Sequence, residues 1–418
     1  MAGFRNERGL PRIHNIELPE KNARIRWILA CVLLLIGGAA IAVGVHSCVS
    51  AQAGWQEVQV SSANRNCSQD FVFNYCYGAS GVDPTTERSR VVTCYSQAVE
   101  DAYAIFNTGI ADSSLGNLTL LNAHPNEAVT VEPELYDALE KICASGSRHV
   151  YLAAVYEQYD HVFSSALDGQ AEDFDPAKNE EARAYVEQLA AFAADPDQID
   201  LQLLENDRVK LRISQSYLDF AEENGLTDFL GLGWMKNAFI ADFLAERLSR
   251  EGFTKGYLAS YDGFTRNLDN GGESYSFNLF DRQGNEIFLP GTLQYSKAMS
   301  IVFLRNYPMT DRDAAGFYGY SDNTITTALI DPTDGMSKSA TDNLVAYSTN
   351  VSCGEIVLKV ASIYVQDEWD AAALQSLTAD GIYSIWFEGS KLQYNQKDVQ
   401  IDMHPVEGTT YRAEYAGK

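Results

Sequence analysis

GLGWMKNAFIAD (residues 231–242) joins a two-glycine turn to a long predicted helix. The helix is predicted from residue 235 to residue 251, and Gly252 supplies a common stop. A turn that opens a helix presents unpaired backbone N–H groups to anions. The same turn also serves ordinary packing, so the glycines by themselves leave both roles open.

A second turn, IDPTDG (residues 330–335), places the carboxylates of Asp331 and Asp334 directly after a predicted strand. Asp, Pro and Gly all favour tight turns, so turn formation alone is one explanation of the motif. The alternative is a site at which the two acids act on a ligand. The six histidines are scattered, and no spacing of serine, histidine and aspartate is typical of a catalytic triad.

Strands and helices follow one another around these turns without strict alternation, which predicts an α+β fold. Strands are predicted at residues 70–77, 209–216, 256–261, 325–330, 344–348 and 382–387, with a hairpin at 274–290 that turns at 282–285. Helices are predicted at 91–107 and 353–364, after a short strand within 129–139, and after an exposed loop within 168–193.

WILACVLLLIGGAAIAVGV (residues 27–45) contains no charged residue, and its length just suffices for a helix to cross a bilayer core of about 30 Å. The residues before it carry six Lys or Arg against three Glu, a net charge of +3. Because basic residues beside a span stay in the cytoplasm, we predict a cytoplasmic tail (1–26), a transmembrane helix (27–45), a stalk (46–69) and an extracytoplasmic domain at the cell membrane. Cleavage as a secretory signal is the alternative, and the long charged start argues against it.

The predicted extracytoplasmic part is strongly acidic. Of the 31 Lys or Arg and 57 Asp or Glu in the chain, 25 and 54 follow the tail, a net charge of −29. This charge argues against binding to nucleic acid or to an anionic membrane face. Six of the seven cysteines lie after the span, where disulfides persist, and the sequence leaves their pairing open.

Four segments in the same order resemble motifs of one family, the ApbE flavin transferases (FAD:protein FMN transferases). GNLTLLN (116–122) with VTVEPELYDAL (129–139) is similar to the family's S-x-L-x-x-L-N and V-x-V-x-x-E-L. GLGWMKNAFIAD resembles D-L-G-G-I-A-K-G-Y-A-V-D, and ALIDPTDG (328–335) resembles H-I-I-D-P-x-T-G. Residues 348–364 take the place of the A-P-S-x-x-x-A-D-A-L-A-T-A helix. The resemblance covers residues 70–395 and leaves 396–418 as a C-terminal extension.

The resemblance implies a domain that binds FAD and Mg²⁺ and attaches FMN to a threonine of a partner redox protein outside the cytoplasmic membrane. A divalent cation neutralises the charge that develops on the pyrophosphate in such a transfer. The family's functional positions correspond here to Asp242 and Asp331 as catalytic residues, to Gly231, Gly233, Lys236, Asn237, Asp262 and Asp334 as cofactor-binding residues, and to Glu355 as a metal ligand.

Several positions depart from the family's pattern and speak against Mg²⁺. The second metal-ligand position is Lys359, whose ammonium has no lone pair for a metal. Since Glu355 and Lys359 are four residues apart on a helix, we expect them to pair, with the ammonium in place of the cation. An ordinary surface pair is the alternative. The family's histidine is Ala328, and the threonine that follows is Asp334.

Three functions remain open on the sequence. The chain is an FAD:protein FMN transferase with unusual ligands, a flavin-binding descendant that has lost the transfer, or an extracytoplasmic sensor or partner-binding domain without flavin. Bound flavin distinguishes the first two from the third. Covalent flavin on an acceptor protein distinguishes the first from the second.

Overall fold

The structure, a computed structural model, describes residues 52–60, 66–109, 115–164 and 170–417. From Ala53 on, the described residues belong to one compact unit. None of its described helices is long and apolar enough to cross a bilayer. The predicted cytoplasmic tail (1–26) and transmembrane helix (27–45) lie outside the described residues and stay predictions.

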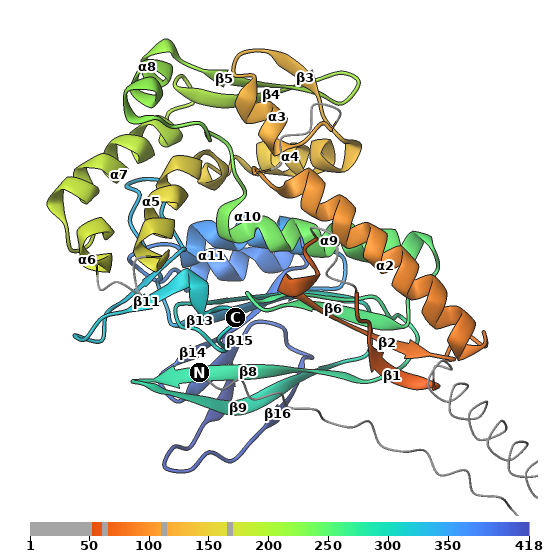
Figure 1. Cartoon of the computed structure of the whole chain (residues 1–418). Coiled ribbons are helices and arrows are strands. Elements are labelled where there is room, and N and C mark those ends of the chain that lie inside the picture. Colours follow the sequence, from red (N-terminus) through yellow and green to blue (C-terminus); the bar gives the residue numbers. More distant parts are fainter. Residues whose placement is uncertain (1–51, 61–65, 110–114, 165–169, 418) are drawn as a thin grey trace, which may run out of the picture. The chain divides into compact units, whose positions relative to one another are not determined.

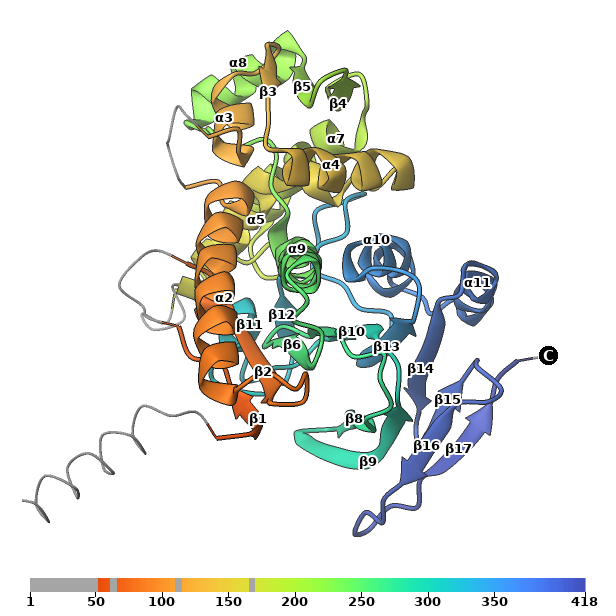
Figure 2. The same cartoon turned by 90° about the vertical axis from the view of Figure 1, so that its right-hand side faces the viewer.

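A nine-stranded sheet runs through the unit (Figures 1 and 2). Its order is β1-β2-β6-β7-β10-β13-β14-β15-β17, and neighbouring strands are antiparallel except β15 and β17. The strands are β1 (Gly54–Glu57), β2 (Phe71–Tyr77), β6 (Gly256–Ser260), β7 (Phe264–Asn267), β10 (Met299–Arg305), β13 (Asn343–Ser348), β14 (Tyr383–Glu388), β15 (Lys391–Tyr394) and β17 (Arg412–Tyr415). β1 lies within the predicted stalk and β17 within the predicted C-terminal extension, and both pair with the sheet through backbone hydrogen bonds that composition does not reveal.

β10 lies in the middle of the sheet, and all seven of its residues are buried. Val302 and Leu304 pack against the helices, whereas Ile301 and Phe303 face the opposite layer. A strand covered on both faces lacks the alternation of polar and apolar residues. For this reason the sequence does not predict β10.

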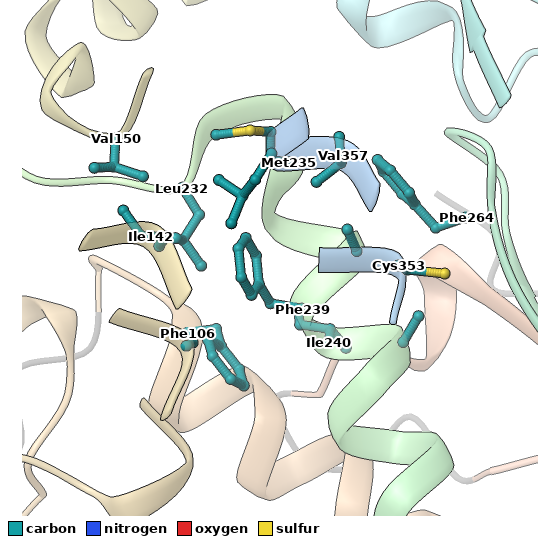
Figure 3. Close-up of a cluster of buried hydrophobic side chains, with 14 of the residues drawn as sticks. Phe106, Ile142, Val150, Leu232, Met235, Phe239, Ile240, Phe264, Cys353 and Val357 are labelled. Atoms are coloured by element: carbon teal, nitrogen blue, oxygen red, sulfur yellow. The ribbon is translucent and has the colours of Figure 1, made fainter. Parts of the chain in front are cut away.

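Three helices cover one face of the sheet: α2 (Pro84–Phe106), α9 (Lys236–Arg250) and α10 (Cys353–Tyr364). The predictions for α9 and α10 are confirmed. α2 begins earlier than the predicted residue 91, because Asp83 accepts the Thr86 N–H and Pro84 fits the first turn. Figure 3 shows Phe239 and Ile240 of α9 beside Val357 of α10 in one buried cluster.

An upper lobe follows α2 in the chain and returns to the sheet through α9 (Figure 1). Its helices are α3 (Leu118–Ala123), α4 (Pro133–Ser145), α5 (Ala153–Ser164), α6 (Ala171–Phe174), α7 (Glu180–Ala194) and α8 (Gln215–Asn224). Its strands β3 (Ala128–Thr130), β5 (Arg208–Ile213) and β4 (Ile199–Leu204) form a small sheet in that order. The strand predicted to reach residue 216 ends earlier, because Ser214 caps α8 by accepting the Tyr217 N–H.

The predicted hairpin is confirmed as β8 (Tyr275–Gln283) and β9 (Glu286–Tyr295), which lie on the face of the sheet opposite the helices. β16 (Gln400–Met403) pairs with β9, and β11 (Phe317–Gly319) pairs with β12 (Ile325–Thr327), which is shorter than predicted. The remaining elements are α11 (Ala371–Ser376) and the 3-10 turns η1 (Ser68–Asp70), η2 (His149–Tyr151), η4 (Gly233–Met235), η5 (Ala314–Gly316) and η6 (Leu377–Asp380). The mixture of sheets and helices confirms the α+β class.

The described cysteines, Cys67, Cys76, Cys94, Cys143 and Cys353, form no disulfide with one another.

Candidate functional site

The turn at residues 231–235 leads from the upper lobe into α9. The Gly231 N–H donates to the Val150 carbonyl at 2.8 Å, and Gly233 opens the 3-10 turn η4. Gly233 has a φ of +51°, and a Cβ here would lie 2.3 Å from the Tyr156 ring. Glycine therefore allows the ring to pack against the turn, which is one of the two roles that the sequence left open.

Two cavities adjoin at this turn. We name them the Asp262 cavity, of about 260 Å³, and the Lys236 cavity, of about 440 Å³. Asn237 and Asp262 line the first; Gly231, Gly233 and Lys236 line the second. Trp234 and Ala328 line both. The structure thus brings five of the predicted cofactor-binding residues to one pair of cavities, with the position of the family's histidine between them.

Lys236 is the free cation of its cavity, since its ammonium forms no ion pair with a described residue. Burial raises the pKa of the Asp70 and Asp160 carboxyls, and the charge of Lys236 opposes that rise. An ammonium without a partner attracts anions such as phosphate. Glu157, Asp160 and Asp228 line the same cavity, so acids outnumber the one lysine among its lining residues, and only the ammonium end suits a phosphate.

Asn237 carries an acceptor that has no partner. Its Nδ2 donates to Asp262 Oδ2 at 2.8 Å, which fixes the orientation of the amide and leaves Oδ1 buried without a hydrogen bond among the described residues. A buried acceptor of this kind costs free energy unless a donor reaches it. Burial raises the pKa of the Asp262 carboxyl, although hydrogen bonds from Ser260 and Asn237 oppose the rise.

An ion pair closes the other side of the Asp262 cavity, and the sequence did not single it out. Arg305 pairs with Asp313, both fully buried, and donates to the Tyr261 carbonyl at 2.7 Å. Burial would raise the pKa of Asp313, but the hydrogen bond from Arg305 lowers it below its usual value. Arg312 lies 4.6 Å above the Tyr261 ring in the same wall. One feature of the sequence could have identified this pair: Arg305 is a charged residue at the end of an otherwise apolar run.

Asp242, predicted to be catalytic, lies outside both cavities and connects α9 to the N-terminus of α10 and to Arg266 of β7. Its two carboxylate oxygens accept the N–H groups of Cys353 and Gly354 at 3.0 and 2.8 Å, at the N-terminus of α10. Oδ1 also accepts Arg266 Nη1 at 2.5 Å. A carboxylate is well placed at a helix N-terminus, where the backbone dipoles are positive. In this geometry Asp242 is a helix cap and an ion-pair partner.

Asp331 and Asp334 also lie outside the two cavities. Both bind the Lys338 ammonium, at 2.9 and 2.7 Å, and Asp367 binds it at 2.9 Å. Asp331 Oδ1 accepts the N–H and the hydroxyl of Thr333, as in an ordinary Asx turn. The structure therefore separates Asp331, predicted to be catalytic, and Asp334, predicted to bind the cofactor, from the five cofactor-binding candidates at the two cavities. It supports the turn explanation of the motif.

The residues at the family's metal positions do not fit a divalent ion. The Glu355 carboxylate accepts the Ser352 hydroxyl at 2.7 Å in a capping box, which draws it toward the start of α10. Lys359 turns to the surface and binds Asp380 at 2.7 Å. The expected Glu355–Lys359 pair is thus absent, and the hypothesis that this ammonium replaces Mg²⁺ is wrong. The described residues contain no group of three His, Cys, Asp or Glu arranged to hold a metal.

His149 packs beside Trp234, with ring centroids 6.0 Å apart, and burial lowers the pKa of its imidazole to about 4, although Asp331 opposes the shift. The unfolded chain binds this proton near pH 6.5 and the native chain near pH 4. The contribution of the neutral His149 to the free energy of unfolding is therefore fully present above pH 6.5. It decreases by about 3 kcal/mol as the pH drops to about 4.

Urea unfolding of the full chain from pH 7 to pH 4, compared with His149→Gln, checks this expectation. The variant should lose the part of the pH dependence that lies between 6.5 and 4. An identical pH dependence in both proteins would contradict a neutral, buried His149.

Comparison with known proteins relates this architecture to one group of solved structures. No family model matches the sequence, and no curated protein matches it. The ApbE protein from Thermotoga maritima superposes with a TM-score of 0.51 at 13% identity, covering 84% of this chain and 97% of that one. Flavin transferase ApbE from Vibrio cholerae gives the same TM-score and the same coverage at 11% identity. The chain therefore has the fold of the ApbE flavin transferases, with a widely diverged sequence.

Proposed function

We propose that the chain is a membrane-anchored, extracytoplasmic flavin-binding protein, descended from FMN transferases, in which metal-dependent transfer is lost. The observation that carries the proposal is the pair of cavities that adjoin at Trp234 and are lined by five residues at the family's cofactor positions. FAD, when bound, supplies a redox-active ring and a pyrophosphate. The anchored placement is supported by the uncharged run at 27–45 and the basic residues before it.

The residues of the two cavities offer distinct contacts to such a ligand. The Lys236 ammonium neutralises a phosphate, and Asn237 Oδ1 accepts a hydrogen bond from a ligand N–H or O–H. Trp234 presents its indole to both cavities, where a planar ring can stack on it. The pair therefore suits a long ligand with an anionic part and a ring-shaped part.

Three features support the loss of transfer. Ala328 stands at the family's histidine position and has no group that takes up a proton, which attack by an acceptor hydroxyl requires. Asp334 is held by Lys338, and Glu355 by its capping box. A partner redox protein that receives FMN belongs to the alternative in which transfer survives.

Flavin binding is tested on the purified full-length chain by titration with FAD and with FMN, followed by quenching of flavin fluorescence. Asn237→Leu keeps the side-chain volume and removes the acceptor, so we expect binding about fivefold weaker, since one hydrogen bond is worth about 1 kcal/mol. Asn224→Leu, at the exposed end of α8, is the matched control and should bind as the parent does. Equal affinity in all three proteins, or no binding, would overturn the proposal.

The loss of transfer is tested separately. The full chain, FAD, Mg²⁺ and a redox protein with an acceptor threonine are incubated, and the products are separated on a denaturing gel. We expect no fluorescent flavin on the acceptor, while an active ApbE enzyme labels it under the same conditions. Covalent flavin on the acceptor would establish the transferase alternative.

A further inference from the structure

A third cavity, of about 630 Å³, lies on the face of the large sheet opposite the helices and takes no part in the proposed flavin site. Its walls are largely aromatic, and we name it the aromatic cavity. The rings come from β1, β6, β8, β9 and β10: Trp55, Tyr257, Tyr275, Phe277, Phe280, Tyr295 and Phe303. Trp55 packs beside Tyr257 and Tyr275, with its ring centroid 5.9 Å from each of theirs, and remains 44% exposed. Aromatic rings that stay open to solvent are the usual anchors of a binding surface.

The cavity runs along the edge of β8 rather than over its face. Four consecutive residues of β8, 275–278, line it, together with residues 273 and 274 just before the strand. A strand that only turned one face to a cavity would contribute every second residue, because its side chains alternate. Consecutive lining residues place the backbone of the strand against the cavity.

That edge of β8 has no partner strand. β16, β9 and β8 form a three-stranded sheet in that order, which we name the β8 sheet, so the described part of the chain pairs β8 with β9 alone. In an antiparallel ladder alternate residues bond to the neighbouring strand, and those between them direct their N–H and C=O groups to the free edge. Ser276 and Asn278 are exposed here, and their side chains form no hydrogen bond with a described residue. The register shift at Leu279/Asp281 limits the regular part of the edge to residues 275–279.

Charge at the cavity is negative. Glu273 lines it, is exposed and has no ion-pair partner among the described residues. Glu57 lies two residues after Trp55 on the same face of β1 and is also exposed. The cation in the wall, Arg305, is neutralised by Asp313. A basic ligand is therefore favoured over an acidic one.

We propose that the free edge of β8 and the aromatic cavity form a docking site for an extended basic segment of a partner protein. The segment adds to the β8 sheet as a strand beside β8, through backbone hydrogen bonds, and places one aromatic or aliphatic side chain against Trp55 and Tyr257. A lysine or arginine of the segment lies near Glu273. Tyr261 and Arg305 line both this cavity and the Asp262 cavity, so the docked segment lies next to the proposed flavin site.

A phage-displayed library of random heptapeptides, panned on the purified full-length chain without flavin, tests the proposal independently of flavin binding. We expect enriched sequences in which an aromatic residue alternates with lysine or arginine and proline is absent. The strongest peptide is then synthesised with each backbone nitrogen methylated in turn. Strand addition predicts that methylation at alternate positions weakens binding about tenfold and that methylation at the positions between them changes it less than about twofold.

Two variants locate the site. Trp55→Ala should weaken the peptide about tenfold, and Glu273→Gln about threefold with a smaller dependence on salt. Tyr415→Ala and Glu407→Gln, exposed residues outside the cavity, are the matched controls and should bind as the parent does. The proposal is overturned if no peptide is enriched, if methylation has no alternating effect, or if the full chain dimerises and Trp55→Ala makes it monomeric. The last result would assign the edge to a second copy of this chain.

Discussion

Asp242→Ala is expected to lower the free energy of unfolding of the full-length chain by about 3–5 kcal/mol, the typical cost of removing one partner of a buried ion pair. The substitution leaves the guanidinium of Arg266 without its carboxylate, in a place where its side chain is 22% exposed. It also leaves the N–H groups of Cys353 and Gly354 without an acceptor at the start of α10. Urea unfolding followed by tryptophan fluorescence measures the loss.

A second substitution separates the charge from the cap. Arg266→Met in the Asp242→Ala background removes the unpaired guanidinium, so part of the loss should return, while the uncapped N–H groups keep the rest. Asp101→Ala breaks a more exposed pair with Arg247 and should cost less than about 1 kcal/mol. An Asp242→Ala protein with unchanged stability would contradict the capping role and return Asp242 to the list of catalytic candidates.

Much of the fold was predictable wherever a segment carried its own signals. α9 follows a two-glycine turn and ends beside Gly252, and the predicted helix at 235–251 matches it within a residue at each end. The hairpin of β8 and β9 turns at the predicted residues, because Gly284, with a φ of +62°, serves its tight turn. Local chemistry decided these elements, and a single sequence contains that chemistry.

The site was predictable only in part, because its residues meet through the sheet. Asn237 and Asp262 were identified one by one from the family's motifs, and only the structure shows that they share a hydrogen bond across 25 positions. Arg305 and Asp313 carried no motif, and their pairing depends on the loop after β10 folding back. Long-range contacts of this kind have no signature in spacing or periodicity.

The metal hypothesis failed for a related reason. Helical spacing correctly placed Glu355 and Lys359 one turn apart, but it did not weigh the competing partners. Ser352 offers Glu355 a capping box, and Asp380 offers Lys359 a carboxylate from η6. Each side chain can bind either the other residue of the helical pair or a nearer partner, and the three-dimensional arrangement, which the sequence does not contain, decides which one it binds. A different lysine, Lys338 in the segment after β12, does bind three carboxylates.

Lys338→Met is expected to destabilise the full chain by about 3–5 kcal/mol at pH 7. Three carboxylates lie within 2.7–2.9 Å of this ammonium, and that of Asp331 is almost fully buried. Burial opposes the charge of Lys338, but the hydrogen bonds that its ammonium donates to Asp334, Asp331 and Asp367 outweigh burial and raise the pKa of the ammonium. Without the lysine, the acids repel one another and the buried carboxylate has no counter-ion.

The pH dependence of that loss has a definite sign. Burial raises the pKa of Asp331, but Thr333 and Lys338 lower it below its usual value, so the contribution of the pair is present above about pH 4 and disappears as the pH falls through the native pKa. The difference in the free energy of unfolding between parent and variant should therefore shrink below about pH 4.

Calcium should stabilise the variant at pH 7, since carboxylate oxygens suit this ion and a ligand that binds the native state alone raises stability. Calcium should leave the parent unchanged, because its own ammonium occupies the space among the acids. Lys359→Met is the matched control: its exposed pair with Asp380 should be worth less than about 1 kcal/mol at any pH, and an equal loss from both lysines would contradict a special role for Lys338.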